Sequence, residues 1–277
     1  MINNAKKIVH HIVQWLKTYI KKTQSNGFVI GISGGIDSAV TSMLVAMTKY
    51  PTLILEMPIL EKNPNLLSEQ HVNFLKSIFL NVHHLKKDLS YLFNSFIHTT
   101  MNDNNITEKK NRPLALANAK SRIRMLTLYY YANIENYLVV GTGNKVEDFG
   151  VGFFTKYGDG GVDIHPIADL TKSEIRLLAK ELNIIDGIQK AEPTDGLWED
   201  QRSDEDQLEA TYEELEWAMK ITEQVEKKKK NFHDTFKGRK YDVLKKYQYL
   251  HKKNEHKIMP IPICEIPDVL RNGKIIC

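Results

Sequence analysis

The sequence has few cysteines and no long apolar run, and both absences narrow what the chain can be. Only Cys264 and Cys277 occur among 277 residues, both near the end and without the spacing of metal ligands. A disulfide framework, a CxxC zinc site and a redox cysteine pair are therefore unsupported. No stretch reaches the roughly 18 apolar residues of a membrane span, so we expect none.

The opening segment and the net charge argue against a secreted protein and a nucleic-acid-binding protein. Residues 1–17, MINNAKKIVHHIVQWLK, carry charges and histidines where a signal peptide would have its apolar core. The formal net charge of +4 is small for this length, so the sequence does not require a nucleic-acid-binding surface, although it would tolerate anionic substrates. With 42% hydrophobic and 26% charged residues, the composition is that of a globular protein with a sizeable core. We therefore expect a cytoplasmic protein with no nucleic-acid partner and no membrane partner.

Strand-type and helix-type patterns alternate along the first half of the chain. Strands alternating with helices indicate a parallel sheet, so the sequence predicts an α/β fold: a doubly wound parallel sheet flanked by helices. A capping box of Thr171 and Glu174 opens a helix at 173–182, and the remainder to about residue 253 is mostly helical after an irregular acidic loop at 190–207. The predicted strands lie at 28–33, 52–58, 81–85 and 137–142, and the earlier helices at 8–20, 37–50, 68–79 and 114–133.

The stretch GISGGIDS, residues 31–38, lies where the first predicted strand meets a helix, which is where ligands bind in doubly wound sheets. Gly34 and Gly35 allow positive φ, so successive N–H groups can form a nest for an anion at the helix N-terminus. Asp37 would repel a phosphate unless Mg²⁺ lies between them, which together indicates a nucleoside triphosphate site. The loop alone fits equally a tight turn with Asp37 as an N-terminal helix charge. It is neither a Walker loop nor a GxGxxG fingerprint.

SGGIDS resembles the SGGxDS loop of the N-type ATP pyrophosphatases, which cleave ATP between its α and β phosphates. Four further blocks narrow the resemblance to the ammonia-dependent NAD synthetases and extend it over nearly the whole chain. They are GTGNKVE (141–147), FFTKYGDGGVDIHPIADLTK (153–172), EPTDGLWEDQRSDEDQL (192–208) and EHK (255–257).

The resemblance implies an adenine nucleotide alpha-hydrolase-like fold and a two-step reaction. The nicotinate carboxylate of deamido-NAD attacks the α-phosphorus of ATP, giving an adenylate and pyrophosphate, and ammonia then gives NAD and AMP. Larger members carry a glutaminase domain with a catalytic cysteine, but neither cysteine here lies in such a context. We therefore expect one synthetase domain over residues 1–277, without a glutaminase domain and with free ammonia as nitrogen donor. A homodimer with deamido-NAD near its interface is also implied.

The resemblance also implies which residues act on ATP and its metal. Asp37 and Glu147 would be the protein ligands of Mg²⁺. Asp37, Lys172 and Asp159 would take part in catalysis, Asp159 near the attacking ammonia. The residues expected to bind ATP are Gly31, Ile32, Ser33, Gly34, Gly35, Ile36, Asp37, Ser38, Thr142, Lys172 and Thr194.

A second set is implied for deamido-NAD, whose pyrophosphate and free carboxylate call for cations. Asp163 could orient a ribose hydroxyl. Arg124, two residues after Arg122 on the same helix, would face elsewhere. The sequence departs from the family on the second strand, where Glu56 replaces an arginine that helps some members hold ATP. The residues expected to bind deamido-NAD are Arg122, Lys156, Asp163, His256 and Lys257.

The same loop is also compatible with three other kinds of protein: a GMP synthetase-like enzyme, a tRNA-thiolating enzyme, or a non-catalytic nucleotide-binding protein. A tRNA-thiolating enzyme needs reactive cysteines and a nucleic-acid surface, which this sequence does not clearly offer. The lysines at 227–230 lie within a predicted helix, so they indicate a solvated face rather than an RNA-binding patch. Retained Asp37 and Glu147 argue against a non-catalytic protein.

Overall fold

The centre of the structure is a four-stranded parallel sheet in the order β3-β2-β1-β4. The computed structural model describes residues 2–61, 66–100, 110–193, 203–228 and 236–271. All four predicted strands are confirmed, although the first, the second and the last end one or two residues earlier than predicted. The strands are β1 (Gly27–Ile32), β2 (Thr52–Glu56), β3 (Val82–Lys86) and β4 (Tyr137–Val140).

The central strands are apolar and buried along nearly their whole length, as parallel strands covered on both faces should be. Glu56 is the exception, because this carboxylate is buried at the end of β2. Its Oε1 accepts a hydrogen bond from Lys86 Nζ at 2.7 Å, and His84 Nε2 lies 3.5 Å from its Oε2. Glu56 and Lys86 are register partners on neighbouring strands, so β3 supplies the cation that balances the acid of β2.

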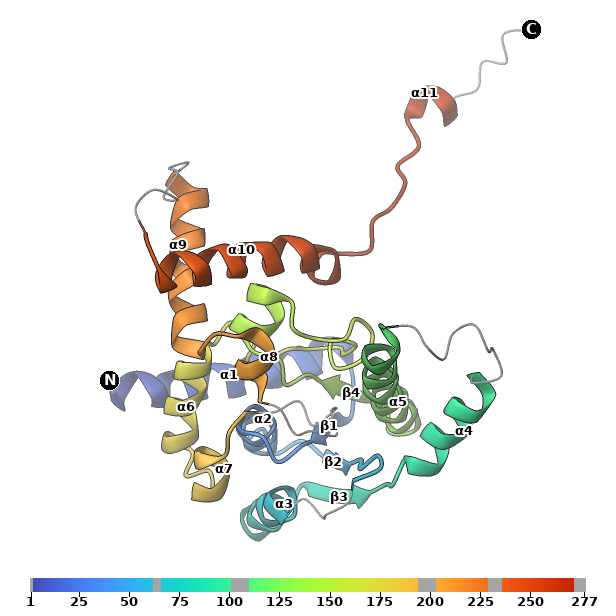
Figure 1. Cartoon of the computed structure of the whole chain (residues 1–277). Coiled ribbons are helices and arrows are strands. Elements are labelled where there is room, and N and C mark those ends of the chain that lie inside the picture. The colour runs from blue at the N-terminus through green and yellow to red at the C-terminus, as the bar shows by residue number, and fades with distance from the viewer. Residues whose placement is uncertain (1, 62–65, 101–109, 194–202, 229–235, 272–277) are drawn as a thin grey trace, which may run out of the picture.

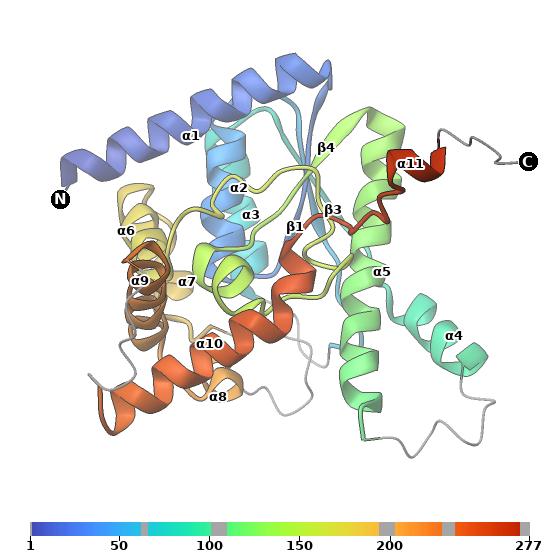
Figure 2. The same cartoon turned by 90° about the horizontal axis from the view of Figure 1, so that it is seen from above.

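Helices cover both faces of the sheet (Figure 2). The face with α1 (Ile2–Thr23), α2 (Ile36–Ala46), α3 (Leu66–Ile78) and α6 (Lys172–Glu181) holds the larger hydrophobic core. On the other face, α5 (Arg112–Glu135) packs against β1 and β4. The doubly wound prediction is thereby confirmed. The pattern did not predict α4 (Ser90–Thr100), because this helix is mostly exposed and fully buries only Phe93.

The C-terminal third is helical, as predicted, and builds a second hydrophobic core over the first (Figure 1). Tyr212 and Leu215 are among its most buried side chains. Residues of η1 (Lys145–Val151), α8 (Asp204–Leu208), α9 (Tyr212–Lys228) and α10 (Arg239–Ile258) form this core. Helix α7 (Asp186–Lys190) instead adds Ile188 to the first core, and the described side chains of α11 (Asp268–Arg271) belong to neither core. The π-helix η1 and the short helix α7 were not predicted, and α8 begins within the segment predicted to be irregular.

The order of the strands determines where a ligand can enter. The chain winds from β1 through α2 to β2 and through α3 to β3, and then crosses by α4 and α5 to place β4 beside β1. The winding direction therefore reverses between β1 and β4. At such a switch point the loops after the two strands diverge and leave a crevice at their carboxyl ends.

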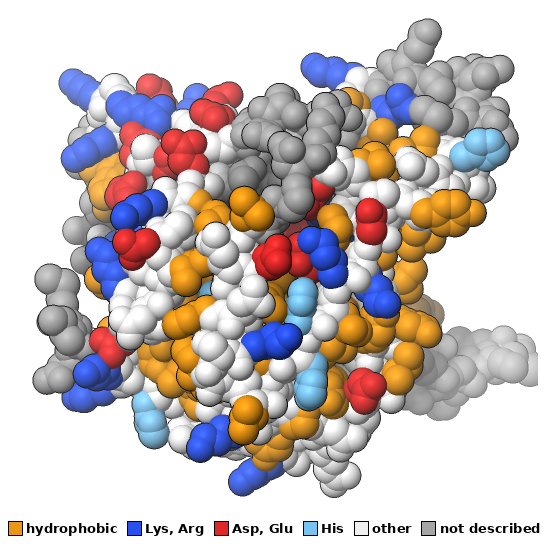
Figure 3. All heavy atoms as spheres, turned by 90° about the horizontal axis from the view of Figure 1, so that it is seen from below, with side chains coloured by type: hydrophobic (Ala, Val, Ile, Leu, Met, Phe, Trp, Pro, Cys, Tyr) orange, Lys and Arg blue, Asp and Glu red, His pale blue; other side chains and the backbone are white. Residues whose placement is uncertain are grey.

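The surface is mixed in charge. Figure 3 shows one face on which basic, acidic and hydrophobic side chains of the described residues are interspersed. None of the helices in the described ranges is long and apolar enough to cross a membrane. The predicted lysine-rich helix face at 227–230 lies partly outside the described residues.

Candidate active site

A cavity of about 1440 Å³ opens at the switch point between β1 and β4. Its walls come from the loops after both strands, from α5, from the 151–159 segment and from the end of α10. The volume exceeds the roughly 300–1,000 Å³ of an ordinary ligand pocket and is large enough for two nucleotides. Of the predicted site residues that the structure describes, all but Asp163 line this cavity, and Thr194 lies outside the described residues.

The 31–38 loop forms one wall. Gly34 has φ of +80°, a conformation that favours glycine, whereas Gly35 has φ of −83° and caps α2 in an extended conformation. The prediction of positive φ is therefore right for Gly34 and wrong for Gly35. Ser33 Oγ accepts from Gly35 N at 3.2 Å, and Ser38 Oγ donates to Gly35 O at 2.9 Å. The two serines thus fold the turn, so that the N-terminus of α2 lies on the cavity wall, where it can bind an anion.

Asp37 and Glu147, the two predicted metal ligands, meet at one ammonium group. Lys172 Nζ donates to Asp37 Oδ2 at 2.6 Å and to Glu147 Oε1 at 3.0 Å, and the lysine side chain is only 3% exposed. Lys172 is the first residue of α6, where Thr171 forms the predicted capping box with Glu174. Three residues far apart in the sequence are therefore joined by buried ion pairs beside the 31–38 loop.

Burial and this shared cation set the protonation of the three groups. Burial raises the pKa of Asp37 above its ordinary value, and the Lys172 ammonium only partly opposes it. Burial acts in the same direction on Glu147, but Lys172 and a hydrogen bond from Tyr212 outweigh it and lower the pKa. Burial would lower the pKa of Lys172, but the two carboxylates outweigh it and raise the pKa. The lysine therefore stays charged.

The donor set fits a magnesium ion. Asp37 lines the cavity, and its Oδ1 is buried and accepts no hydrogen bond. This carboxylate oxygen is therefore free to bind a metal ion. In the part of the chain that the structure describes, no three His, Cys, Asp or Glu side chains come together as a metal site. Mg²⁺ is usually held by one or two carboxylates with water and substrate phosphates, so Asp37 and Glu147 would suffice.

Two residues that were not predicted orient this pair. Asn144 Oδ1 accepts from Glu147 N at 3.0 Å, and its Nδ2 lies 3.5 Å from Asp37 Oδ2. The Tyr212 hydroxyl donates to Glu147 Oε1 at 2.5 Å. Burial and the nearby carboxylates raise the pKa of Tyr212, so the phenol keeps its proton. Asn144 lies inside GTGNKVE and could have been found there, whereas Tyr212 comes from α9 and only the fold brings it to the site.

Asp148 is a third buried carboxylate, which the sequence did not single out. Burial, followed by the charges of nearby carboxylates including Glu147, raises its pKa well above the ordinary value. Its side chain fills the space that Gly143 leaves, and its Oδ2 lies 3.9 Å from His165 Nδ1. The cavity wall therefore carries more acidic than basic groups at its centre.

The predicted deamido-NAD residues lie at the other end of the cavity. The Arg122 guanidinium donates twice to Lys156 O, at 3.2 Å each, and Lys156 Nζ donates to His256 O at 2.8 Å. Arg124 instead donates to Met57 O at 3.0 Å, so the two arginines reach different walls, as predicted. The structure therefore brings Arg122, Lys156 and His256 together at one end of the cavity, joined through the backbone carbonyls of Lys156 and His256.

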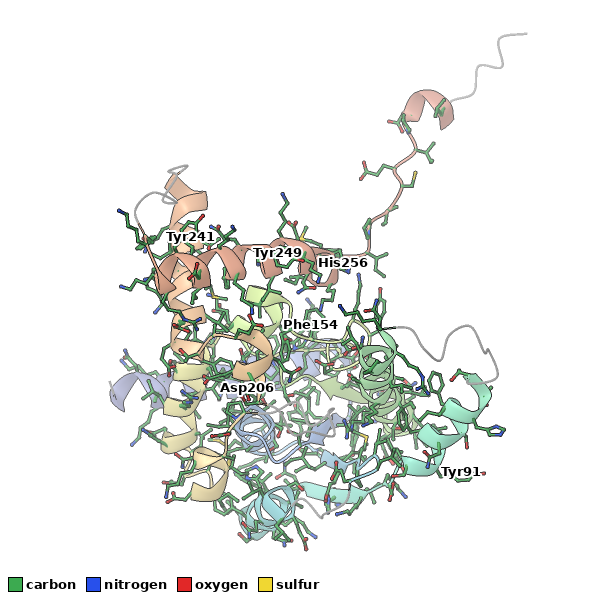
Figure 4. The ribbon with its side chains drawn as sticks, in the orientation of Figure 1. Tyr91, Phe154, Asp206, Tyr241, Tyr249 and His256 are labelled. Atoms are coloured by element: carbon green, nitrogen blue, oxygen red, sulfur yellow. The ribbon has the colours of Figure 1, made fainter. Side chains whose placement is uncertain are left out.

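The end of α10 is tied to the glycine-rich segment beneath it. Lys257 Nζ donates to the carbonyl oxygens of Gly152 and Phe154, and Asn254 Nδ2 donates to Val151 O at 2.8 Å. Figure 4 shows His256 at the end of α10, with Phe154 in the region below it. Helix α10 therefore fixes the segment that carries Lys156.

The two predicted aspartates of the glycine-rich block have different surroundings. Asp159 lines the cavity, and its Oδ1 accepts from Ser121 Oγ at 2.7 Å. Asp163 Oδ1 accepts from the Tyr129 hydroxyl at 3.0 Å, and its Oδ2 accepts from Val139 N at 2.8 Å. Asp163 therefore ties β4 to α5 and does not line the cavity.

Sequence comparison gives one consistent family. Residues 8–260 match the family model described as NAD synthase. The NH(3)-dependent NAD(+) synthetase of Malacoplasma penetrans is 35% identical over 272 residues, which cover 96% of this chain and 98% of the relative. The protein of the same name from Methanocaldococcus jannaschii is 35% identical over 265 residues, covering 95% and 98%.

Solved structures agree with the sequence relatives. The NMN synthetase from Francisella tularensis has a TM-score of 0.77 and 30% identity, with 95% of this chain and 99% of that chain covered. The NH3-dependent NAD synthetase from Campylobacter jejuni has a TM-score of 0.73 and 26% identity, with 94% and 99% covered. The predicted adenine nucleotide alpha-hydrolase-like fold is thereby confirmed.

Proposed function

The chain belongs to the NAD synthase family, and from that membership we propose that it makes NAD from deamido-NAD, ATP and ammonia. The nicotinate carboxylate attacks the α-phosphorus of ATP, and pyrophosphate leaves. Ammonia then attacks the carbonyl of the adenylate, and AMP leaves. The enzyme forms a carbon–nitrogen bond and is therefore a ligase. The observation that carries the proposal is the meeting of Asp37, Glu147 and Lys172 beside the 31–38 loop.

The ATP half of the cavity explains the first step. A carboxylate is a poor acyl donor, so the protein must position it against the α-phosphorus and stabilise the charge that develops on pyrophosphate. The N-terminus of α2 and the serines of the 31–38 loop would hold the phosphates, and Thr142 lies on the adjoining wall. Lys172 would contribute its ammonium to the triphosphate. The proposed phosphate contact of Thr194 lies outside the described residues.

Asp37 and Glu147 would hold magnesium, and the unbonded Asp37 Oδ1 supports this assignment. When bound, Mg²⁺ neutralises charge on the departing pyrophosphate. Asp37→Asn should keep the fold but lose metal-dependent AMP formation, measured with deamido-NAD and ammonium present. Near-normal turnover in this variant would contradict the metal assignment.

The second half of the cavity would bind deamido-NAD. Arg122, Lys156 and Lys257 would supply the cations that the pyrophosphate and carboxylate of the dinucleotide require, and His256 would contact the dinucleotide beside them. Asp159 would lie near the attacking ammonia. If Asp163 orients a ribose hydroxyl, the ligand must replace its hydrogen bond from Tyr129.

We also propose a homodimer, on the basis of the outer face of α5. One face of this helix packs on the sheet, yet Leu126, Tyr130 and Ile134 form a second apolar stripe at four-residue spacing, and each is 59–61% exposed. A helix that is apolar on two faces is typically covered on both. Size-exclusion chromatography with light scattering should give twice the mass of one chain, and Tyr130→Glu should shift it toward the monomer.

The remaining proposals concern the nitrogen donor, the domain organisation and the cellular location. Residues 1–277 would act as a single synthetase domain in the cytoplasm, supplied with free ammonia. Initial rates with ammonium and with glutamine test this directly. Efficient use of glutamine by the purified chain would contradict it.

The decisive experiment is product analysis after incubation with ATP, Mg²⁺, deamido-NAD and ammonium. We expect NAD, AMP and pyrophosphate in equal amounts, with AMP release dependent on both deamido-NAD and ammonium. ATP binding without AMP release would indicate a non-catalytic nucleotide-binding protein instead. A parallel arm offers nicotinate mononucleotide, because one structural neighbour is an NMN synthetase. A clear preference for the mononucleotide would replace deamido-NAD as the assigned substrate.

A further inference from the structure

Tyr212 combines complete burial with an unusual set of polar contacts. It is the first residue of α9 and is 0% exposed. Its hydroxyl donates to Glu147 Oε1 at 2.5 Å and lies 3.2 Å from Asp204 Oδ2. The Lys172 ammonium lies 4.7 Å from the centroid of its ring. One tyrosine therefore contacts both a proposed metal ligand and the cation that neutralises it.

The same tyrosine is linked to described residues at the base (the two ends) of the irregular loop predicted at 190–207, the second loop. Asp204 N donates to Pro193 O at 3.0 Å, so the residues on either side of segment 194–202 are joined. Tyr212 N donates to Glu205 Oε1 at 3.0 Å, and α8 begins at Asp204. Tyr212 therefore lies between Glu147, to which its single hydroxyl proton is donated, and Asp204, whose backbone N–H is bonded to Pro193 O.

The hydrogen bond from Tyr212 differs from that of Lys172 in what it can do during the reaction. Both groups donate to the same oxygen, Glu147 Oε1. The lysine has a flexible side chain that a triphosphate would attract. The tyrosine ring is packed in the second hydrophobic core with Val146 and Leu215, and it has no room to follow. The phenol is therefore the donor that remains when the ammonium moves.

We propose that Tyr212 is a positioning residue that holds the Glu147 carboxylate in its metal-binding orientation and couples it, through Asp204, to the base of the second loop. This inference rests on the proposed function, because it assumes that Glu147 binds magnesium. Hydrogen bonds that orient a metal ligand typically account for about 10- to 100-fold in metal affinity. Tyr212 does not itself touch the reacting atoms.

The experiment compares Tyr212→Phe with a matched control, Tyr247→Phe, which removes a phenol from the same core away from Glu147. Mn²⁺ is the probe. It is titrated into the full chain with ATP and without deamido-NAD, and protein-bound Mn²⁺ is followed by its enhancement of water proton relaxation, with Mn²⁺ and ATP without protein as the blank. We expect Mn²⁺ binding to weaken by about 10-fold or more in Tyr212→Phe and to stay unchanged in the control. ATP binding without metal should be the same in all three proteins.

A second variant, Asp204→Asn, keeps the bond between Tyr212 and Glu147 and the backbone bond to Pro193 O, and it changes only the carboxylate beside the Tyr212 hydroxyl. It should weaken Mn²⁺ binding less than Tyr212→Phe does, and it carries the test if Tyr212→Phe does not fold. Wild-type Mn²⁺ affinity in Tyr212→Phe would overturn the positioning role, and wild-type affinity in Asp204→Asn would overturn the coupling. If the wild-type chain itself binds no Mn²⁺ with ATP, the metal assignment fails and the inference fails with it.

Discussion

Replacing Lys172 by methionine tests whether one buried ammonium stabilises the proposed metal site in the ligand-free chain. Methionine keeps most of the side-chain volume but removes the charge that lies 2.6 Å from Asp37 and 3.0 Å from Glu147. The lysine side chain is 3% exposed, so water cannot easily replace the lost interaction. The variant would leave two carboxylates facing each other without a cation.

The size of the effect follows from this burial. Removing one partner of a buried ion pair costs about 3–5 kcal/mol, and about 2 °C is lost per kcal/mol in a domain of this size, so Tm should fall by roughly 6–10 °C. The folded pKa of Asp37 is already raised and should rise further. A group with a raised folded pKa stabilises the fold at low pH, so the variant should lose stability as pH rises through that pKa. Losing the proposed phosphate contact should lower kcat by about 10²–10³.

Thermal unfolding across pH, with and without Mg²⁺ and ATP, measures these effects. The control is Lys145→Met, because Lys145 Nζ lies 3.3 Å from Asp169, whose side chain is 98% exposed. Such a surface pair contributes less than about 1 kcal/mol. Mg²⁺ with ATP should restore more stability to Lys172→Met than to the wild type, since a second cation then fills the site. An unchanged Tm in Lys172→Met would refute the idea that the lysine neutralises the pair.

Two further predictions concern other buried side chains, Asp148 and His71. Gly143→Ala would place a Cβ against both Asp148 carboxylate oxygens, 2.7 Å from Oδ1, and should lower stability by about 1–3 kcal/mol. Adding Asp148→Ala should restore the Tm, and a double variant as unstable as the single one would contradict the clash. Burial lowers the pKa of His71 to about 4, so the folded chain keeps it neutral while the unfolded chain binds a proton below about 6.5. Denaturant unfolding should show the free energy of unfolding falling by up to about 1.4 kcal/mol for each unit that the pH is lowered from about 6.5 to about 4. His71→Gln should remove that slope.

The sequence was enough to predict the sheet and its winding. Buried parallel strands are short apolar runs, and the longer helices between them are rich in apolar residues, so both patterns are local. The elements that were missed have weak local signals. Helix α4 fully buries one residue, Phe93, and α8 has only five residues, so neither repeats a pattern often enough to be seen. The π-helix η1 depends on Asn144, which caps it by accepting from two backbone N–H groups.

The site was predictable to the extent that it lies in short motifs. The 31–38 loop, Glu147 and Lys172 each belong to a short sequence motif that resembles the family, and the structure brings them together. Tyr212 could not be found in this way, because it belongs to a helix of the second core and reaches Glu147 only through the fold. Asp163 shows the opposite case, since it lies inside a matching block but its carboxylate binds Val139 N and the Tyr129 hydroxyl.

The charge balance of the cavity explains why the chain tolerates so costly a site. Asp37, Glu147 and Asp148 lie close enough to affect one another's pKa, and Lys172 is the cation that bridges the first two. Buried carboxylates that outnumber their cations are destabilising, so the fold carries this arrangement at the expense of its stability. A metal ion that enters with ATP would supply the missing positive charge, and its binding energy would then add to folding stability. A group of carboxylates in excess over lysine is therefore better suited to receive cations than to hold the fold together.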